Sequence, residues 1–296
     1  MITLRTVPDM SAAVREAKAA GRTIGFVPTM GFLHEGHLSL VREARRVSDV
    51  VVVSIFVNPL QFGPKEDFRV YPRDIDRDSR LLEPLGVDYL FSPSEGEMYP
   101  PGHATFVEVQ GLQDRLCGRS RPGHFRGVCT VVLKLFEIVR PDRAFFGQKD
   151  AQQALIITRM AADLNLGVTV ETRPTVREPD GLALSSRNAY LSVEERRAAT
   201  VLWRSLEEVR RECAGGETDA EALLRTMQGL IDREPLAKVD YLAIVRPDTL
   251  EPVSRVEGET LVALAVYFGR TRLIDNILLR PDGWPEGQNV KLMKKG

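Results

Sequence analysis

The sequence has few cysteines, no excess of either charge and no long apolar run. Its three cysteines, Cys117, Cys129 and Cys213, are odd in number and far apart along 296 residues. That spacing fits neither a disulfide framework nor a local zinc site. The formal charge of -1, from 40 basic and 41 acidic residues, provides no global field that would attract nucleic acid or an anionic membrane.

No apolar stretch approaches the length of a membrane span, and residues 1–5 lead directly into a polar pattern without the features of a signal peptide. We therefore expect a soluble, cytoplasmic protein. The sequence also lacks internal repeats and low-complexity segments. With 43% hydrophobic and 27% charged residues, it is long enough for a large core and for two domains.

Apolar runs alternate with helical patterns over residues 1–175, which predicts parallel βαβ units. The run at 50–57 is continuously apolar, as expected of a strand buried on both faces. The polar segments that follow such strands meet at one edge of a parallel sheet, where ligands bind. Strands are predicted at 23–27, 50–57, 89–91, 105–109, 143–146 and 168–172, and helices at 11–20, 36–46, 130–139 and 151–164.

From residue 176 to residue 296 the pattern predicts a smaller α+β domain. Ser192 to Glu195 forms a capping-box sequence that opens one long helix to about Cys213, and two glycines end it. A second helix is predicted at 219–233. Short connections between three β-like runs, 239–245, 260–268 and 273–279, favour an antiparallel sheet, and the tail from Pro281 is expected to be loosely ordered.

The turn after the first predicted strand carries two of the four histidines, His34 and His37, in an H-x-G-H pattern at the mouth of a helix. Free N–H groups and the helix dipole attract phosphate there, and Gly31 and Gly36 allow close backbone approach. Two imidazoles three residues apart can donate hydrogen bonds to one polyphosphate. A zinc protease motif would need i, i+4 spacing, so we exclude it. Two polar histidines in a surface loop are the plain alternative.

The segment P-T-M-G-F-L-H-E-G-H at 28–37 resembles the nucleotide-binding turn of the pantothenate synthetase family, the pantoate:beta-alanine ligases of the HxGH nucleotidyltransferase superfamily. The resemblance implies a Rossmann-like domain at 1–175 that binds nucleotide and pantoate, and a C-terminal domain at 176–296 on the lid side. Further motifs at matching places span nearly the whole chain; they lie at 57–63, 71–73, 145–153, 180–188 and 271–276.

The resemblance also implies roles for individual residues. Catalysis is assigned to His37, His34, Lys149 and Arg187, and pantoate binding to Gln61 and Gln153. The segment at 147–150 is no Walker A motif, and Leu184 stands where the family usually has methionine. The nucleotide is expected to contact Met30, Gly31, Phe32, Leu33, His34, Glu35, Gly36, His37, Gly147, Gln148, Lys149, Asp150, Val176, Leu184, Ser185, Ser186 and Arg187.

Each assignment has a plain alternative. Lysine after glycine is ordinarily surface charge, 185–187 resembles a linker before a helix cap, and Asn58-Pro59 can simply initiate a turn. The charged run at 64–80 is by default a solvated face, whereas the resemblance places it over the active site with Asp78 near a bound Mg²⁺. The basic loop at 118–127 suits either a lid or a dimer contact. A homodimer is implied by the family alone.

We therefore predict an ATP-dependent ligase that condenses pantoate with β-alanine through pantoyl adenylate, with ATP and Mg²⁺ as its nucleotide substrate and metal. The neutral overall charge disfavours the tRNA synthetases of the same superfamily. Two alternatives stay open at this point. One is another HxGH adenylyltransferase that acts on a phosphorylated acceptor, and the other is a nucleotide-binding sensor or scaffold without turnover.

Overall fold

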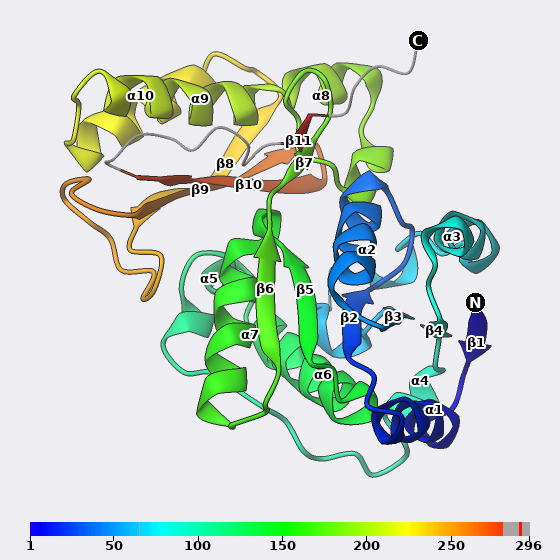
Figure 1. Ribbon diagram of the computed structural model, residues 1–296. Coiled ribbons are helices and arrows are strands. Elements are labelled where there is room, and N and C mark those ends of the chain that lie inside the picture. Colours follow the sequence, from blue (N-terminus) through cyan, green and yellow to red (C-terminus); the bar gives the residue numbers. More distant parts are fainter. Residues whose placement is uncertain (65, 281–289, 292–296) are drawn as a thin grey trace. The chain divides into compact units, whose positions relative to one another are not determined.

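The computed structural model describes residues 1–64, 66–280 and 290–291, and the chain divides into two compact units (Figure 1). The first unit contains Met1–Asp114, Arg121–Gly147 and Gln153–Arg173. The second contains Arg115–Ser120, Gln148–Gln152 and the chain from Pro174 onward. Residues 115–120 and 148–152 therefore belong to the second unit, whereas the segments that flank them in sequence belong to the first.

The first unit is built on a six-stranded sheet in which every neighbouring pair is parallel. Its strands, in spatial order, are β1 (Ile2–Leu4), β4 (Tyr89–Phe91), β3 (Val50–Ile55), β2 (Ile24–Thr29), β5 (Arg143–Gly147) and β6 (Thr169–Arg173). Its helices are α1 (Val7–Ala19), α2 (Glu35–Val47), α3 (Ile75–Leu82), α4 (Glu95–Met98), α6 (His124–Val139) and α7 (Ala151–Asp163).

The sequence explains the central position of β2 and β3. Residues 24–27 of β2 and 50–53 of β3 are buried, and α2 presents Leu40, Val41 and Ala44 to the core beside Val27 and Phe145. The chain runs outward from β2 to β3 and β4, and β5 lies on the other side of β2. The ends of β2 and β5 therefore flank the point where the strand order reverses, the usual ligand position in such sheets.

In this unit one predicted strand is wrong, and one observed strand was not predicted. Residues 105–109 form no strand and pair with none of the described strands, and the backbone N–H of Val107 instead donates to Thr130 Oγ1 at 3.0 Å. No sequence pattern indicated β1, whose three residues become a strand only by pairing with β4. The first and sixth helices also begin earlier than predicted, at Val7 and His124.

The second unit contains the predicted antiparallel sheet, formed in the order β10 (Thr271–Leu279), β9 (Thr260–Phe268) and β8 (Ala237–Val245). Helices α9 (Val201–Ala214) and α10 (Ala220–Ile231) pack on it through a shared apolar cluster. The parallel sheet and this smaller α+β unit confirm the predicted fold class. The unit also contains α5 (Cys117–Ser120), α8 (Val193–Ala198), β7 (Val176–Arg177) and β11 (Val290–Lys291).

The capping box at Ser192 and Glu195 is present, but the single long helix predicted after it is wrong. The chain changes to i→i−3 hydrogen bonds at Thr200 and Leu202, which separates α8 from α9. The prediction for the tail from Pro281 falls outside the described residues, apart from the two of β11, which pair with β7. Within the described part of the chain, no helix is both long and apolar enough to cross a bilayer.

Candidate active site

The HxGH turn connects the carboxyl end of β2 to the amino end of α2. β2 ends at Thr29, and His34 occupies the position immediately before the first turn of α2. His37 lies one turn further on, and the two imidazole rings are 4.1 Å apart between centroids. The structure therefore brings the two predicted catalytic histidines together at a helix N-terminus, beside the point where the strand order reverses.

The two histidines cap the helix that carries them. The Nδ1 atom of His34 accepts from the backbone N–H of Gly36 at 3.2 Å, and Nδ1 of His37 accepts from the backbone N–H of His34 at 3.3 Å. Serine and glutamate usually fill these two roles. Because each Nδ1 must present a lone pair to its N–H donor, the neutral rings carry their proton on Nε2. The fold thus sets both imidazoles as Nε2–H donors.

A buried carboxylate supports the main chain of the same turn. Asp78, on the first turn of α3, accepts from the backbone N–H groups of Phe32 at 2.7 Å and Leu33 at 2.8 Å. Gly31 and Phe32 both adopt positive φ, and a Cβ on Gly31 would lie 2.9 Å from Ile55 Cγ2. Burial raises the pKa of Asp78, although the two N–H groups oppose the rise.

The contacts of the Asp78 carboxylate matter for its predicted role as a metal ligand. Both carboxylate oxygens accept backbone hydrogen bonds, and Oδ1 also lies 3.2 Å from Arg77 Nη1. No group of three or more histidine, cysteine, aspartate or glutamate side chains among the described residues could hold a metal ion. The geometry makes Asp78 a support of the HxGH turn, and its metal role stays a prediction.

The predicted pantoate residue Gln61 lies beside the HxGH turn. It ends the short 3₁₀ turn η1 (Pro59–Gln61) that follows β3, and its Nε2 is 3.2 Å from Met30 Sδ. Asn58 Nδ2 donates to Gln61 Oε1 at 3.1 Å, and Tyr99 donates its hydroxyl to Asn58 Oδ1 at 2.8 Å. Asn58 thereby fixes the amide with its oxygen inward, so Nε2 is the group that Gln61 presents beside Met30.

Helix α6 fixes the main chain of the same segment. A Cβ on Gly127 would lie 2.2 Å from the carbonyl oxygen of Leu60, so only glycine allows this approach. His124 Nδ1 donates to the carbonyl oxygen of Gln61 at 2.8 Å. Arg121 donates to the same oxygen and pairs with Glu66 at 2.6 Å; although burial opposes it, this pairing lowers the pKa of Glu66.

These contacts correct the prediction of a basic loop at 118–127. Cys117–Ser120 is helix α5 of the second unit, and α6 of the first unit begins at His124 after Gly123, whose φ is 80°. Sequence reasoning assigned Arg121 and His124 to a lid or a dimer contact. In the structure they hold the carbonyl group of Gln61, more than 50 residues earlier in the chain, and no local pattern indicates that partnership.

The remaining predicted residues fall in different units. Gln153 is half-buried on α7 in the first unit. Lys149 lies in the 3₁₀ turn η5 (Gln148–Asp150), and Ser185 caps the turn η6 (Ser186–Tyr190) by accepting from the backbone N–H of Arg187 at 3.2 Å; both turns belong to the second unit. Val176 accepts a backbone hydrogen bond from Leu184 at 3.0 Å there.

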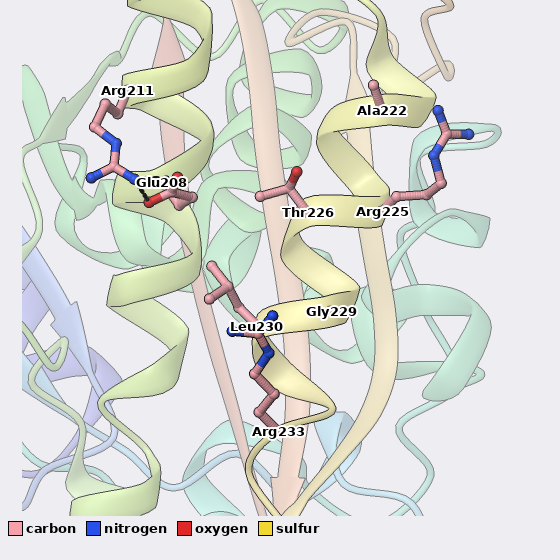
Figure 2. Close-up of a pocket in the computed structure, with 8 residues that line it drawn as sticks. All are labelled: Glu208, Arg211, Ala222, Arg225, Thr226, Gly229, Leu230 and Arg233. Carbon is pink, nitrogen blue, oxygen red and sulfur yellow. Dashed lines mark hydrogen bonds and ion pairs between the residues drawn. The ribbon is translucent and has the colours of Figure 1, made fainter.

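A surface depression of about 650 Å³ lies between α9 and α10, and none of the residues that line it is a predicted site residue (Figure 2). Arg211 pairs with Glu208 there. The side chains of Arg211 and Arg225 point in opposite directions in Figure 2, so they do not converge on one anion. We assign no function to this depression. Its lining residues are Glu208, Arg211, Ala222, Arg225, Thr226, Gly229, Leu230 and Arg233.

The parallel sheet and the HxGH turn define a Rossmann-like α/β protein with a histidine pair at a helix mouth. Residues 2–278 match the family model described as pantoate-beta-alanine ligase, and the chain belongs to this family of enzymes. It is 59% identical over 279 residues to the pantothenate synthetase of Pelotomaculum thermopropionicum, covering 94% of this chain and 99% of that protein. The same identity and coverage hold for the pantothenate synthetase of Heliobacterium modesticaldum.

Solved structures agree with this assignment. The pantothenate synthetase of Thermus thermophilus is 50% identical, covers 94% of this chain and 99% of its own, and superposes with a TM-score of 0.90. The pantoate-beta-alanine ligase of Francisella tularensis, complexed with Beta-gamma ATP and Beta-alanine, is 35% identical with a TM-score of 0.78. It covers 97% of this chain and 100% of its own. The protein is thus an enzyme of the ATP-binding ligase class.

Proposed function

We propose that the protein condenses (R)-pantoate with β-alanine to give pantothenate, AMP and pyrophosphate, through a pantoyl-adenylate intermediate. Family membership and the complex of the Francisella tularensis relative with Beta-gamma ATP and Beta-alanine support the choice of substrates. The observation that carries the proposal is the histidine pair at the mouth of α2, in which both Nδ1 atoms accept backbone N–H groups. Each ring then offers Nε2–H to a phosphate oxygen.

The adenylate solves a chemical difficulty, because a free carboxylate has no leaving group that an amine can displace. A carboxylate oxygen of pantoate attacks the α-phosphorus of ATP, and the bond from that phosphorus to the bridging oxygen breaks as pyrophosphate leaves. The deprotonated amine of β-alanine then attacks the acyl carbon, the amine proton is lost to solvent, and AMP leaves. Negative charge increases on the phosphate oxygens during the first step, where hydrogen-bond donors act most strongly.

We assign transition-state stabilisation to His34 and His37, whose rings can donate through Nε2 while each Nδ1 accepts from the main chain. Lys149 and Arg187 are assigned to the phosphates of ATP, as a point charge and a planar donor respectively. Mg²⁺ would enter as MgATP and neutralise part of the phosphate charge.

Gln61 is assigned to pantoate through Nε2, which the contact between Asn58 and Oε1 directs toward Met30. Gln153 is assigned to pantoate by family resemblance. The mechanism requires no covalent enzyme intermediate, and two of the three cysteines are poorly suited to form one. Burial raises the pKa of Cys129 to about 12 and that of Cys213 to about 11, which keeps both in the unreactive thiol form at neutral pH.

The decisive experiment is pyrophosphate exchange without amine. The protein is incubated with MgATP, labelled pyrophosphate and one candidate acid at a time. Because adenylation is reversible until β-alanine reacts, label should enter ATP only when pantoate is present. Exchange should vanish in Lys149→Ala and persist in Lys238→Ala, which removes an exposed lysine of the same unit.

Other outcomes would point elsewhere. Exchange that does not need pantoate would favour an adenylyltransferase with another acceptor. Protein that binds ATP but exchanges with no acid would favour a sensor or scaffold. The homodimer and the cytoplasmic location stay predictions.

A further inference from the structure

Two adjacent buried residues on β10, Asp275 and Asn276, contact two separate segments of the second unit. Their exposed fractions are 2% and 5%. Successive side chains of a strand point to opposite faces of the sheet. Leu273 and Ile277 share the face of Asp275 and belong to the apolar cluster beneath α9 and α10. Asn276 therefore faces the other side, and the pair connects the two faces at one point of the strand.

Asn276 holds the turn that carries Lys149. Its Nδ2 donates to the carbonyl oxygens of Gln148 and Lys149, each at 2.9 Å, and its Oδ1 accepts from Gln148 Nε2 at 2.9 Å. Both protons of the amide are therefore used on two successive carbonyl groups. An aspartate of the same shape would oppose those carbonyls with an acceptor, so the contact depends on the amide chemistry of this residue.

Asp275 holds the base of the segment that carries Ser185 to Arg187. Its carboxylate binds Arg177 through two hydrogen bonds of 2.5 and 2.8 Å, and both side chains are at most 1% exposed. The guanidinium also donates to the carbonyl oxygen of Gly181 at 3.1 Å and lies 3.8 Å from the ring centre of Trp203. A bidentate pair buried this completely fixes the orientation of both partners.

The segment above this ion pair is a narrow hairpin. Backbone bonds join Glu178 to Leu182 at 2.8 Å and Leu184 to Val176 at 3.0 Å, and the η6 turn follows directly. Gly181 has φ of 94°, and a Cβ there would lie 1.8 Å from Trp203 Cδ1. Trp203 therefore packs against both Gly181 and the Arg177 guanidinium of this hairpin, and Asp275 holds that guanidinium in place. In this way Asp275 indirectly sets where η6 begins.

We propose that Asp275 and Asn276 are positioning residues for ATP, which set the two phosphate-binding segments of the second unit in one mutual geometry. The inference rests on the proposed function of Lys149 and Arg187, and it goes further by giving the T-R-L-I-D-N motif a role. Misplacement of a binding group by about 1 Å can reduce a rate about 100-fold. Because one strand anchors both segments, neither can shift relative to the other.

The test uses the full-length protein with Asn276→Asp and Asn276→Ala. We expect pyrophosphate exchange to fall about 10- to 100-fold and the KM for MgATP to rise, while the KM for pantoate changes less than about threefold. Ile277→Val is the matched control, since it trims a buried neighbour on the same strand. This control should lower Tm without selectively raising the KM for MgATP.

A double-mutant cycle separates positioning from simple destabilisation. The cycle is measured as MgATP binding by calorimetry, because exchange is expected to vanish in Lys149→Ala. If Asn276 acts through the Lys149 turn, adding Asn276→Ala to Lys149→Ala should weaken MgATP binding little beyond the loss caused by Lys149→Ala alone. Fully additive losses of MgATP affinity in the cycle, or equal increases in the KM values for MgATP and pantoate in the single Asn276 variants, would overturn the proposal. For Asp275, Asp275→Asn should speed amide hydrogen exchange in residues 177–188 and leave β8 and β9 unchanged. If Asp275→Asn fails to fold, the double-mutant cycle of Asn276 and Lys149 still tests the positioning proposal.

Direct ATP binding by calorimetry keeps this inference distinct from the proposed function. If the wild type shows no pantoate-dependent exchange but binds MgATP, the ligase proposal fails while the positioning proposal is still tested. Weaker MgATP binding by Asn276→Asp than by Ile277→Val would then support positioning. Equal binding by the two variants would refute it.

Discussion

Replacement of Asp78 by asparagine tests whether this residue supports the HxGH turn or binds a metal. The carboxylate accepts two backbone hydrogen bonds, from Phe32 and Leu33, whereas the amide oxygen of asparagine can replace only one of them. A hydrogen bond to a charged group contributes about 1.5–3 kcal/mol to stability. In the variant, one of the two backbone N–H groups faces the NH₂ of the asparagine and loses its acceptor. Relief from burying a charge offsets part of this, so we expect a net loss of about 1–3 kcal/mol in the free energy of unfolding at neutral pH.

The catalytic effect should exceed the effect on stability. Without one of its two anchors, the turn shifts the imidazoles of His34 and His37, and a displacement of about 1 Å can reduce the rate about 100-fold. The assay is pyrophosphate exchange at several Mg²⁺ concentrations, with urea unfolding in parallel. Asp76→Asn, an exposed carboxylate on the same helical turn, is the control and should behave as the wild type.

The dependence on Mg²⁺ distinguishes the two roles. A support of the turn predicts a reduced rate with an unchanged half-saturating Mg²⁺ concentration. Restoration of Asp78→Asn to the wild-type rate by added Mg²⁺ would refute our reasoning and favour the metal role.

The pH dependence of stability provides a second check. Burial raises the pKa of Asp78 in the native state, so between its usual value and the raised value the native protein binds more protons than the unfolded chain. The stability contributed by this group must therefore fall as pH rises through that window and stay level above it. Asp78→Asn lacks this contribution. The stability of the wild type minus that of the variant should decrease with rising pH in the acid range, and an increase would contradict the burial of the charge.

Two further predictions address the first unit. His37→Gln should keep the backbone contact that caps α2, because glutamine is a usual residue at this position of a capping box. Its rate of pyrophosphate exchange should nevertheless fall by about 100- to 1,000-fold. Wild-type exchange by the folded variant would show that the imidazole has no part in catalysis. Gln61→Ala and Gln61→Glu both remove the Nε2 donor, and both should raise the KM for pantoate while calorimetry shows nearly unchanged ATP binding. Loss of ATP affinity instead would sink the placement of pantoate at Gln61.

Much of the fold was predictable from local patterns. The apolar run of β3 and the turn residues before α2 indicated a parallel sheet with a histidine pair at its edge, and both are present. Predictions failed where a partner distant in sequence decides the local structure. β1 is a strand because it pairs with β4, whereas residues 105–109 pair with none of the described strands.

The sequence by itself determined the fold class, the family and the position of the HxGH turn, because these depend on periodicity and motifs that extend over a few residues. Only the tertiary structure decided which side chains support the site. Asp78 is 46 residues from Phe32, and Asn276 is 128 residues from Gln148. A buried polar group takes whichever partner packing brings within hydrogen-bond distance, and the burial that makes an unpaired group costly exists only in the folded chain.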